Sequence, residues 1–180
     1  LELSLEGSRL SYEPGDSLGY APQNDPRLVE ALLTGLRAAP QTPVRVGSAE
    51  LPLVEALTSR LDLRALPRSA ARAYAQLAGG ELKTLASDDA TLNAYLRGRD
   101  WLDLVTEFPV ALPPQGFVEL LTPLASRSYS IASSQRTHPE ELFLLISRVS
   151  YLRYARERLP APSGQLCDRV QPRDTLPVWI

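Results

Sequence analysis

The sequence predicts a mixed α and β protein in which a β-barrel is interrupted by a helical insertion. Strand-like patterns occur in residues 1–22 and 123–180, and helical patterns fill residues 23–122 between them. A barrel built from both ends of the chain is the simplest arrangement that brings the two strand-rich blocks together. The chain has 180 residues, 44% of them hydrophobic, so it is long enough to bury a core.

The first strand-rich block begins with an alternation of leucines. Leu1, Leu3 and Leu5 project from one face of an extended segment. Leu10 and Tyr12 follow a turn that contains a glycine. This pattern predicts a β-hairpin at the N-terminus.

The middle block carries helix caps and helical spacing. Asp25 is placed to cap a helix that begins at Pro26. Leu28, Leu32 and Leu36 then recur at every fourth residue, which puts them on one helix face. Further helical segments are expected at residues 52–57, 69–77, 87–98 and 116–121. Gly79-Gly80 would end the segment 69–77, and Ser87 or Asp88 would cap the next one.

The last block returns to strands. Residues 126–133 form a polar strand, and the apolar run 142–146 has the length of a buried strand. A short helix is expected at residues 163–170, and a final strand at residues 176–180.

Composition argues against several classes of site and partner. The formal net charge of −2 argues against a nucleic-acid surface. No run of about 18 apolar residues occurs, so no membrane span is expected. A single cysteine and a single histidine argue against a zinc site, and no metal is expected. No signal-peptide pattern opens the chain, and we expect a cytoplasmic location.

The polar strand is the most informative segment of the chain. Arg127 and Tyr129 are two residues apart, so they project from the same face of an extended strand. A guanidinium donates two parallel hydrogen bonds to phosphate oxygens, and an aromatic face suits a planar heterocycle. The pair favours a ligand with a diphosphate and a fused ring system. A serine-rich edge strand with a surface ion pair is the alternative explanation.

Four segments resemble the diflavin reductases in order and spacing. Residues 127–134, Arg-Ser-Tyr-Ser-Ile-Ala-Ser-Ser, resemble the FAD-binding strand of that family. Residues 12–19 resemble its Tyr-x-Pro-Gly-Asp-x-Leu-Gly hairpin, residues 24–26 its Asn-Asp-Pro segment and residues 166–170 its Leu-x-Asp-Arg-Val helix. The family includes NADPH–cytochrome P450 reductase and the sulfite reductase flavoprotein subunit. The resemblance implies an antiparallel, ferredoxin-reductase-like, flavin-binding β-barrel with an inserted all-helical connecting domain.

The resemblance implies a role for each residue of the motif strand. Arg127 would pair with the FAD diphosphate, with Ser128 next to it in the binding strand. Tyr129 would contact the isoalloxazine and ribityl region. Ser130 would be the catalytic residue, at the flavin edge near the hydride-accepting nitrogen. Strict strand alternation turns Ser130 away from Arg127, so this contact requires a bend or twist.

The adenosine half of FAD would lie further along the chain. The resemblance implies that Leu145, Ile146 and Ser147 line the adenosine end. Tyr151 would lie against the adenine. Tyr154 could take this role instead, or Tyr151 could be an ordinary aromatic residue of a strand with no ligand contact.

A second phosphate contact is expected before the short helix near the C-terminus. The resemblance assigns it to Pro160, Ala161, Pro162 and Ser163. The N-terminus of a helix offers unpaired N–H groups and a partial positive charge to a phosphate. Ser163 either caps this helix or donates a hydrogen bond to the phosphate.

The implied chemistry is electron transfer from NADPH through FAD and FMN to a haem or iron–sulfur acceptor, with sulfite reductase as the first expectation. A P450-reductase-like or nitrate-assimilation flavoprotein is the alternative. The chain has no Gly-rich loop for a nicotinamide nucleotide. An NADPH-binding domain and a flavodoxin-like FMN domain are therefore expected elsewhere in a longer chain, and the acceptor in a separate subunit. We expect the isolated chain to be inactive.

Two alternatives from other classes remain open. One is a non-catalytic interaction module that keeps the flavin-binding fold. The other is a phosphorylated regulatory segment, because Arg127-Ser128 and Arg136-Thr137 resemble kinase sites directed by a basic residue.

Overall fold

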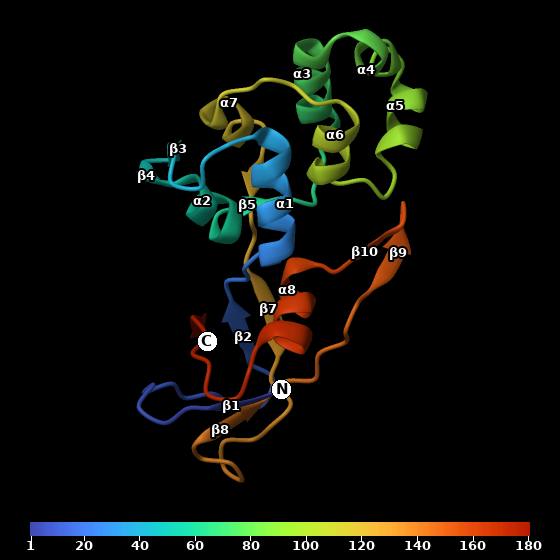
Figure 1. The fold of residues 1–180 in the computed structure, drawn as a ribbon. Helices are drawn as coiled ribbons and strands as arrows, with labels where there is room; N and C mark the ends of the chain where they lie inside the picture. The colour runs from blue at the N-terminus through green and yellow to red at the C-terminus, as the bar shows by residue number, and fades with distance from the viewer. The chain divides into compact units, whose positions relative to one another are not determined.

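The computed structural model describes all residues 1–180 and divides them into two units. Unit 1 comprises residues 1–23, 125–151 and 159–180, and unit 2 comprises residues 24–124 and 152–158. Figure 1 labels most of the helices and strands of both units. The mixed α and β content expected from the sequence is confirmed.

Unit 1 is built from short antiparallel strands. Strand β1 (Glu2–Ser4) pairs with β8 (Glu141–Phe143). Strand β2 (Ser17–Tyr20) lies between β11 (Val178–Trp179) and β7 (Arg127–Ser130) in a three-stranded sheet. Strands from the beginning and the end of the chain therefore lie side by side, as Figure 1 shows.

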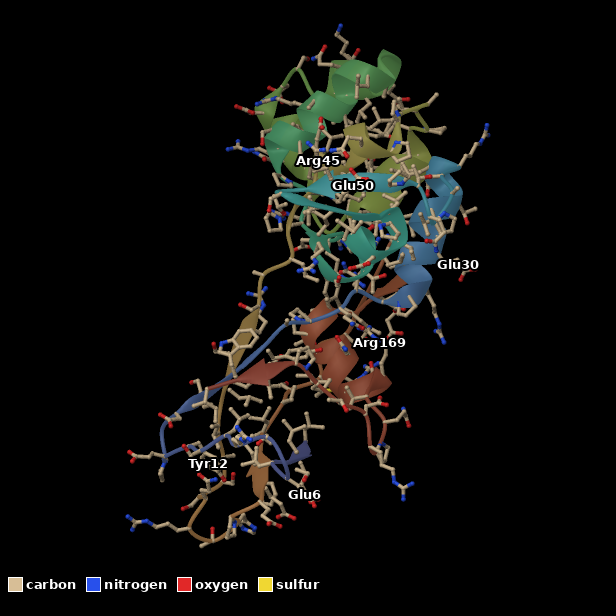
Figure 2. The ribbon with its side chains drawn as sticks, turned by 90° about the vertical axis from the view of Figure 1, so that its left-hand side faces the viewer. Glu6, Tyr12, Glu30, Arg45, Glu50 and Arg169 are labelled. Atoms are coloured by element: carbon tan, nitrogen blue, oxygen red, sulfur yellow. The ribbon has the colours of Figure 1, made fainter.

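A small apolar core lies between these strands. Its buried members are Leu5, Tyr12, Leu18, Ile131, Leu142 and Leu144. The Tyr12 hydroxyl donates to the carbonyl of Glu141 at 2.9 Å and lies 2.7 Å from the Ser133 hydroxyl. Figure 2 labels Tyr12 within this unit. Its polar tip is thereby satisfied inside an otherwise apolar environment.

Two expectations for unit 1 are wrong. Strand β1 pairs with β8 and not with residues 10–12, so the N-terminal segment is not a hairpin. The apolar run 142–144 offers β1 a more apolar partner than Leu-Ser-Tyr at residues 10–12. The run 142–146 is also not uniformly buried, because Leu142 is 0% exposed whereas Leu145 is 90% exposed. Side chains alternate along an extended chain, so consecutive positions do not face one core.

Unit 2 contains most of the helices. They are α1 (Pro26–Leu36), α2 (Leu53–Ser59), α3 (Arg68–Ala78), α4 (Gly80–Leu85), α5 (Asp89–Leu96), α6 (Trp101–Glu107) and α7 (Pro114–Val118). As expected, the Asp25 carboxylate caps α1 by accepting a hydrogen bond from the Arg27 amide at 2.9 Å. The sequence did not predict α4 or α6. No helix of the structure combines the length and the apolar character needed to cross a lipid bilayer.

The core of unit 2 is centred on an aromatic group. Trp101 is fully buried and meets Tyr74 and Phe117 edge to face, with ring centroids 6.2 and 5.4 Å away. Its indole N–H donates to the carbonyl of Ala65 at 2.8 Å. Of the leucines expected on one face of α1, Leu28 and Leu32 are buried in the same core, and Leu36 packs against it half-buried.

Unit 2 is not all helical, so that expectation is wrong. Strands β3 (Pro43–Val46) and β4 (Ala49–Pro52) form a hairpin, and β5 (Leu61–Asp62) pairs with β6 (Thr122–Pro123). Gly47 has a φ of +60°, which suits the hairpin turn, and β-branched valines alternate before it. Figure 2 labels Arg45 and Glu50, which lie opposite each other across this hairpin.

A second hairpin carries two arginines to the start of helix α6. It consists of β9 (Tyr151–Arg153) and β10 (Arg156–Arg158). Arg156 reaches the Asp100 and Asp103 carboxylates at 2.5 and 2.8 Å. Arg158 reaches the same two groups at 2.5 and 2.7 Å. We refer to these four residues as the Asp–Arg cluster.

The Asp–Arg cluster is built on the capping box of α6. The Asp100 carboxylate accepts from the amide of Asp103, and the Asp103 carboxylate accepts from the amide of Asp100. The side chains of Arg158 and Asp100 are only 2% and 4% exposed. Charged groups this buried are stable only when they are paired and hydrogen-bonded. Both carboxylates and the terminal nitrogens of Arg158 meet this condition, and only the Arg158 Nε–H lacks a partner.

The Asp–Arg cluster predicts an acid-sensitive contribution to stability. Burial opposes ionisation of Asp103, but hydrogen bonds from Arg158, Asp100 and Arg156 outweigh it, so the pKa of this carboxyl is lowered. Its contribution is therefore present above the unfolded pKa of about 4 and is lost as the pH falls through the folded pKa. Urea unfolding between neutral and acidic pH should show stability falling below about pH 4, with a smaller fall in Asp103→Asn. Equal pH dependence in the two proteins would contradict this.

Candidate functional site

Strand β7 carries the residues that drew attention in the sequence. Arg127 and Tyr129 are opposite Tyr20 and Leu18 of β2 in the antiparallel register. Directly opposed residues share a face of the sheet, so these four side chains lie on one side. Arg127 is exposed, whereas Tyr129 is half-buried against the core of unit 1. The cation and the aromatic ring are therefore side by side, as expected for their spacing.

The serines of β7 lie on the other face of the sheet. Ser128 is opposite Gly19, and Gly19 is in turn opposite Trp179 of β11. Gly19 leaves room for this indole, because a Cβ at that position would lie 2.2 Å from it. Ser128 and Ser130 are both exposed. Exposure of Ser128 leaves the alternative of a phosphorylated regulatory segment open.

The free edge of β7 offers a way for one ligand to reach both faces. β7 pairs with β2 on one side only, and no strand pairs with its other side along Arg127–Ser130. The register keeps Ser130 on the face away from Arg127, so β7 itself has no bend that unites them. A ligand that runs along the unpaired edge can meet side chains of both faces and backbone groups between them.

Tyr20 belongs to the same face and was missed in the sequence. It is buried, and its hydroxyl has no hydrogen-bond partner. Burial raises the pKa of this hydroxyl, with Arg169 acting in the opposite direction, so it remains a protonated donor. The sequence offered one signal for Tyr20, its position directly after the Tyr-x-Pro-Gly-Asp-x-Leu-Gly segment. Its place opposite Arg127 is given only by the strand register.

The expected phosphate loop forms the start of a short helix. Helix α8 (Ala161–Gly164) has Pro160 at its N-cap position and Pro162 in its first turn. Ser163 therefore lies inside the helix, and the expectation that it caps the helix is wrong. Both prolines are tolerated because N–H groups of the first turn have no intrahelical partner. The Ser163 hydroxyl is buried without a hydrogen-bond partner, which leaves a donor for a ligand atom.

The segment after α8 is fastened to the N-terminal part of unit 1. It forms a short π-helix, η1 (Gln165–Arg169). The Gln23 amide donates to the Gln165 side chain at 2.6 Å, and the Arg169 guanidinium donates to the Gln23 carbonyl at 2.6 Å. These two bonds hold η1 on the same unit as β2 and β7.

The residues expected at the adenosine end lie on the loop after β8. Leu145 and Ser147 are exposed, and Ile146 is half-buried against the core of unit 1. Arg148 fastens this loop by donating to both oxygens of Asp168, at 2.7 and 3.0 Å. The loop therefore presents two large apolar side chains, Leu145 and Val149, to solvent on either side of this anchored segment.

The two tyrosines considered for the adenine have different surroundings. Tyr151 is 51% exposed and belongs to unit 1. Tyr154 belongs to unit 2, where its hydroxyl donates to the Arg97 carbonyl at 3.0 Å and Arg99 stacks on its ring at 4.1 Å. Tyr154 is thus occupied, whereas the Tyr151 ring is available for stacking.

Unit 1 therefore combines features that fit a dinucleotide with a planar ring. It offers an exposed guanidinium beside a half-buried aromatic ring, an unpaired strand edge, and an exposed tyrosine. Two buried hydroxyls, those of Tyr20 and Ser163, lack a partner. Buried polar groups are normally hydrogen-bonded, so these two indicate polar ligand atoms.

Comparison with known proteins gives a consistent picture. Residues 1–158 match the family described as FAD binding domain. The chain is 43% identical, over 186 residues, to the sulfite reductase (NADPH) flavoprotein alpha-component of Bacillus subtilis strain 168. It is 36% identical, over 181 residues, to the protein of the same name from Neisseria meningitidis serogroup C strain 053442.

These alignments cover all of this chain but only part of each relative. They include 100% of this chain but 31% of the Bacillus protein and 30% of the Neisseria protein. A relative from Mannheimia succiniciproducens is 35% identical, and 30% of its length is covered. The chain thus spans about a third of the length of the curated relatives that it matches.

Proposed function

The chain belongs to the FAD-binding domain family of the diflavin reductases, and on this premise we propose that it is the FAD-binding part of an NADPH-dependent sulfite reductase flavoprotein. Electrons would pass from NADPH through FAD to FMN and then to a haem or iron–sulfur acceptor. The observation that carries the proposal is the Arg127-Ser128-Tyr129-Ser130 strand with its unpaired edge, in a chain that matches this family over residues 1–158.

The proposed architecture assigns the strand-rich ends to one domain. Residues 1–22 and 123–180 would form the flavin-binding β-barrel, and residues 23–122 would form the inserted connecting domain. The pairing of β2 with β7 and β11 supports the first assignment. The aromatic core around Trp101 supports the second, because it gives the insertion a core of its own.

The residues of this chain would bind and orient the cofactor. Arg127 would neutralise the diphosphate through charge-assisted hydrogen bonds, with Ser128 next to it in the strand and Ser163 as a second donor. Tyr129 would hold the isoalloxazine by ring contact, and Ser130 would donate to its edge from the other face of β7. FAD supplies the redox chemistry, while the protein supplies position and electrostatics.

The adenosine half would extend toward the loop after β8. Tyr151 would stack on the adenine, and Leu145, Ile146 and Ser147 would line its far side. Tyr154 is not retained as the stacking residue, because Arg99 and Arg97 already engage it. The segment Pro160–Ser163 would meet the diphosphate between the two halves.

The partners follow from the proposed electron path. An FMN-binding flavodoxin-like domain and an NADPH-binding domain would belong to the same longer chain, and a haem or iron–sulfur subunit would accept the electrons. A P450-reductase-like or nitrate-assimilation flavoprotein would use the same FAD site with a different acceptor. Purification of the full-length gene product with its acceptor subunit, followed by sulfite-dependent NADPH oxidation, separates these alternatives.

Replacement of Arg127 tests the site itself. Arg127→Ala should weaken FAD binding by about 1.5–3 kcal/mol, the range for hydrogen bonds to charged groups. Titration of FAD into the wild-type and variant chains, followed by flavin fluorescence, measures the change. Arg136→Ala removes another exposed arginine of unit 1 and should leave the affinity unchanged. If Arg127→Ala binds FAD as tightly as the wild type, Arg127 does not contact the diphosphate.

A further inference from the structure

Two buried hydroxyl groups of unit 1 have no hydrogen-bond partner in the structure. They belong to Tyr20, which is 1% exposed, and to Ser163, which is 7% exposed. The Arg158 Nε–H is a third buried group of this kind, but its guanidinium pairs with two carboxylates through its other nitrogens. A buried hydroxyl without a partner has lost its hydration without compensation. The two hydroxyls are therefore the groups that a polar ligand atom would satisfy.

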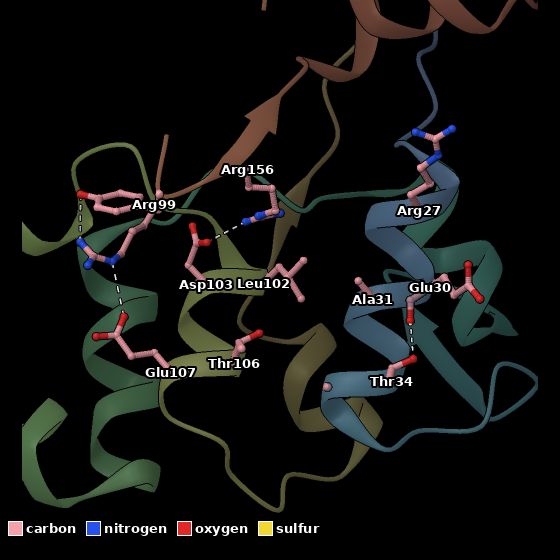
Figure 3. A pocket seen from close by; sticks show the side chains of 12 residues that line it. Arg27, Glu30, Ala31, Thr34, Arg99, Leu102, Asp103, Thr106, Glu107 and Arg156 are labelled. Atoms are coloured by element: carbon pink, nitrogen blue, oxygen red, sulfur yellow. Dashed lines mark hydrogen bonds and ion pairs between the residues drawn. The ribbon is translucent and has the colours of Figure 1, made fainter. Parts of the chain in front are cut away.

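The groove of unit 2 offers no hydroxyl of this kind. It has a volume of about 800 Å³, and Arg27, Arg99 and Arg156 are its cations. Figure 3 shows that Arg99 pairs with Glu107 and Arg156 with Asp103 along its walls. Most of its charge is thus neutralised within unit 2, and none of the side chains that line it has a buried polar atom without a partner.

The strand register places Tyr20 level with the proposed phosphate contact. Tyr20 lies on the middle strand β2, opposite Arg127 of β7 and opposite Val178 of β11. One pair further along the same face, Leu18 is opposite Tyr129. Residues directly opposite each other are neighbours on one face of a sheet. The guanidinium and the aromatic ring of β7 thus belong to two successive rows, and Tyr20 shares the row of the guanidinium.

A second guanidinium lies close to the Tyr20 hydroxyl. Burial raises the pKa of this hydroxyl, and the positive charge of Arg169 opposes the effect, so the two groups are near each other. Arg169, labelled in Figure 2, is fixed by its hydrogen bond to the carbonyl of Gln23, three residues beyond Tyr20. A protonated hydroxyl beside a cation suits an anionic oxygen, which accepts the hydrogen bond and is attracted by the charge.

The phosphate segment Pro160–Ser163 has few backbone donors. Two of its residues, Pro160 and Pro162, carry no N–H group, so only Ala161 and Ser163 keep one. A diphosphate has several charged oxygens that accept hydrogen bonds. Side-chain donors from other elements have to replace the two that proline removes, and the Tyr20 hydroxyl is one of them.

We propose that the Tyr20 hydroxyl is a donor held free for the flavin-side phosphate of FAD, the phosphate that FMN also carries. The inference rests on the proposed function and adds a residue from outside the motif strand and the phosphate segment. Two residues along a strand separate the row of Tyr20 from the row of Tyr129 by about 7 Å. The ribityl chain, which links the isoalloxazine to this phosphate, can span that distance.

The test removes one oxygen atom and compares three flavins. Tyr20→Phe keeps the ring and deletes only the hydroxyl. FAD and FMN contain the flavin-side phosphate, whereas riboflavin lacks it. We expect the Kd for FAD and for FMN to rise about ten- to hundredfold, the equivalent of one hydrogen bond to a charged group, and the Kd for riboflavin to stay within about twofold. Titrations followed by flavin fluorescence measure the three constants.

The stability of the ligand-free chain gives a second, independent measurement. Loss of a buried hydroxyl that has no partner should leave the urea midpoint unchanged or raise it. Tyr12→Phe is the matched control, because the Tyr12 hydroxyl is hydrogen-bonded to the carbonyl of Glu141 and lies 2.7 Å from the Ser133 hydroxyl. This control should lower the urea midpoint and leave all three Kd values unchanged. A tyrosine with a purely structural role behaves like Tyr12.

The outcomes distinguish this inference from the proposed function. A lower urea midpoint for Tyr20→Phe would show that the hydroxyl is already bonded in the ligand-free chain, which overturns the inference. So does an unchanged Kd for FAD, an equal loss for all three flavins, or a loss for FAD alone. If the wild type binds no FAD and Arg127→Ala is indistinguishable from it, the proposed function itself fails. Tight FAD binding by the wild type, weakened by Arg127→Ala but not by Tyr20→Phe, overturns only the role of Tyr20.

Discussion

Replacing Arg158 by methionine should lower the free energy of unfolding by about 3–5 kcal/mol, the cost of removing one partner of a buried ion pair. Arg158 is 2% exposed and reaches both carboxylates of the cluster. Methionine fills much of the same space but leaves Asp100, which is 4% exposed, with less compensating charge. Urea unfolding followed by tryptophan fluorescence is a suitable measurement, because Trp101 lies in the core of unit 2.

A surface ion pair provides the matched control for this prediction. Arg72→Met removes an arginine that is 42% exposed and pairs with Asp89, which is 65% exposed. Exposed pairs contribute about 0–1 kcal/mol, so this variant should unfold almost like the wild type. If both variants lost a similar amount of unfolding free energy, burial would not explain how much the Asp–Arg cluster stabilises the protein.

The parts of the fold that the sequence predicted are mostly local. Asp25 and Asp88 cap helices because their carboxylates accept hydrogen bonds from amides only two or three residues away. Gly79 ends α3 with a φ of +66°, a conformation that depends on one residue alone. Features of this kind are visible in a window of a few residues, so spacing and residue type are sufficient to find them.

The features that the sequence did not predict depend on distant partners. β1 pairs with β8, with Leu3 opposite Leu142. The local sequence of neither segment identifies the other as its pairing partner. The Asp–Arg cluster joins positions more than 50 residues apart. Nothing in the local sequence of Arg158 distinguishes a buried ion pair from a solvated surface charge. Tertiary pairing decided these cases, as it does for most short strands.

The candidate site falls between these two cases. The shared face of Arg127 and Tyr129 followed from strand alternation, and the register of β7 with β2 agrees with it. Tyr20 was missed because its place opposite Arg127 depends on pairing between segments more than 100 residues apart. The unpaired edge of β7, on which the proposed contact of Ser130 depends, likewise follows only from the sheet order.

FAD bound to the 180-residue chain alone should not be reduced by NADPH at an enzymatic rate. Hydride transfer needs the nicotinamide held at near-contact distance from the flavin, and such positioning is worth about 7–11 kcal/mol of the barrier. The sequence carries no Gly-rich loop between a strand and a helix that would hold a nicotinamide nucleotide. Loss of the flavin's visible absorbance after rapid mixing with excess NADPH measures the rate.

A longer stretch of the gene product provides the comparison for this last prediction. With the proposed NADPH-binding domain included, FAD should be reduced rapidly, and delivery to a haem acceptor should additionally require the FMN domain. Reduction of both proteins by dithionite checks that the bound FAD can be reduced in each. If FAD can be reduced in both proteins but NADPH reduces it rapidly only in the longer one, the slow rate of the short chain is due to the lack of nicotinamide positioning. Rapid bleaching of the 180-residue chain by NADPH would instead mean that these residues contain a nicotinamide site.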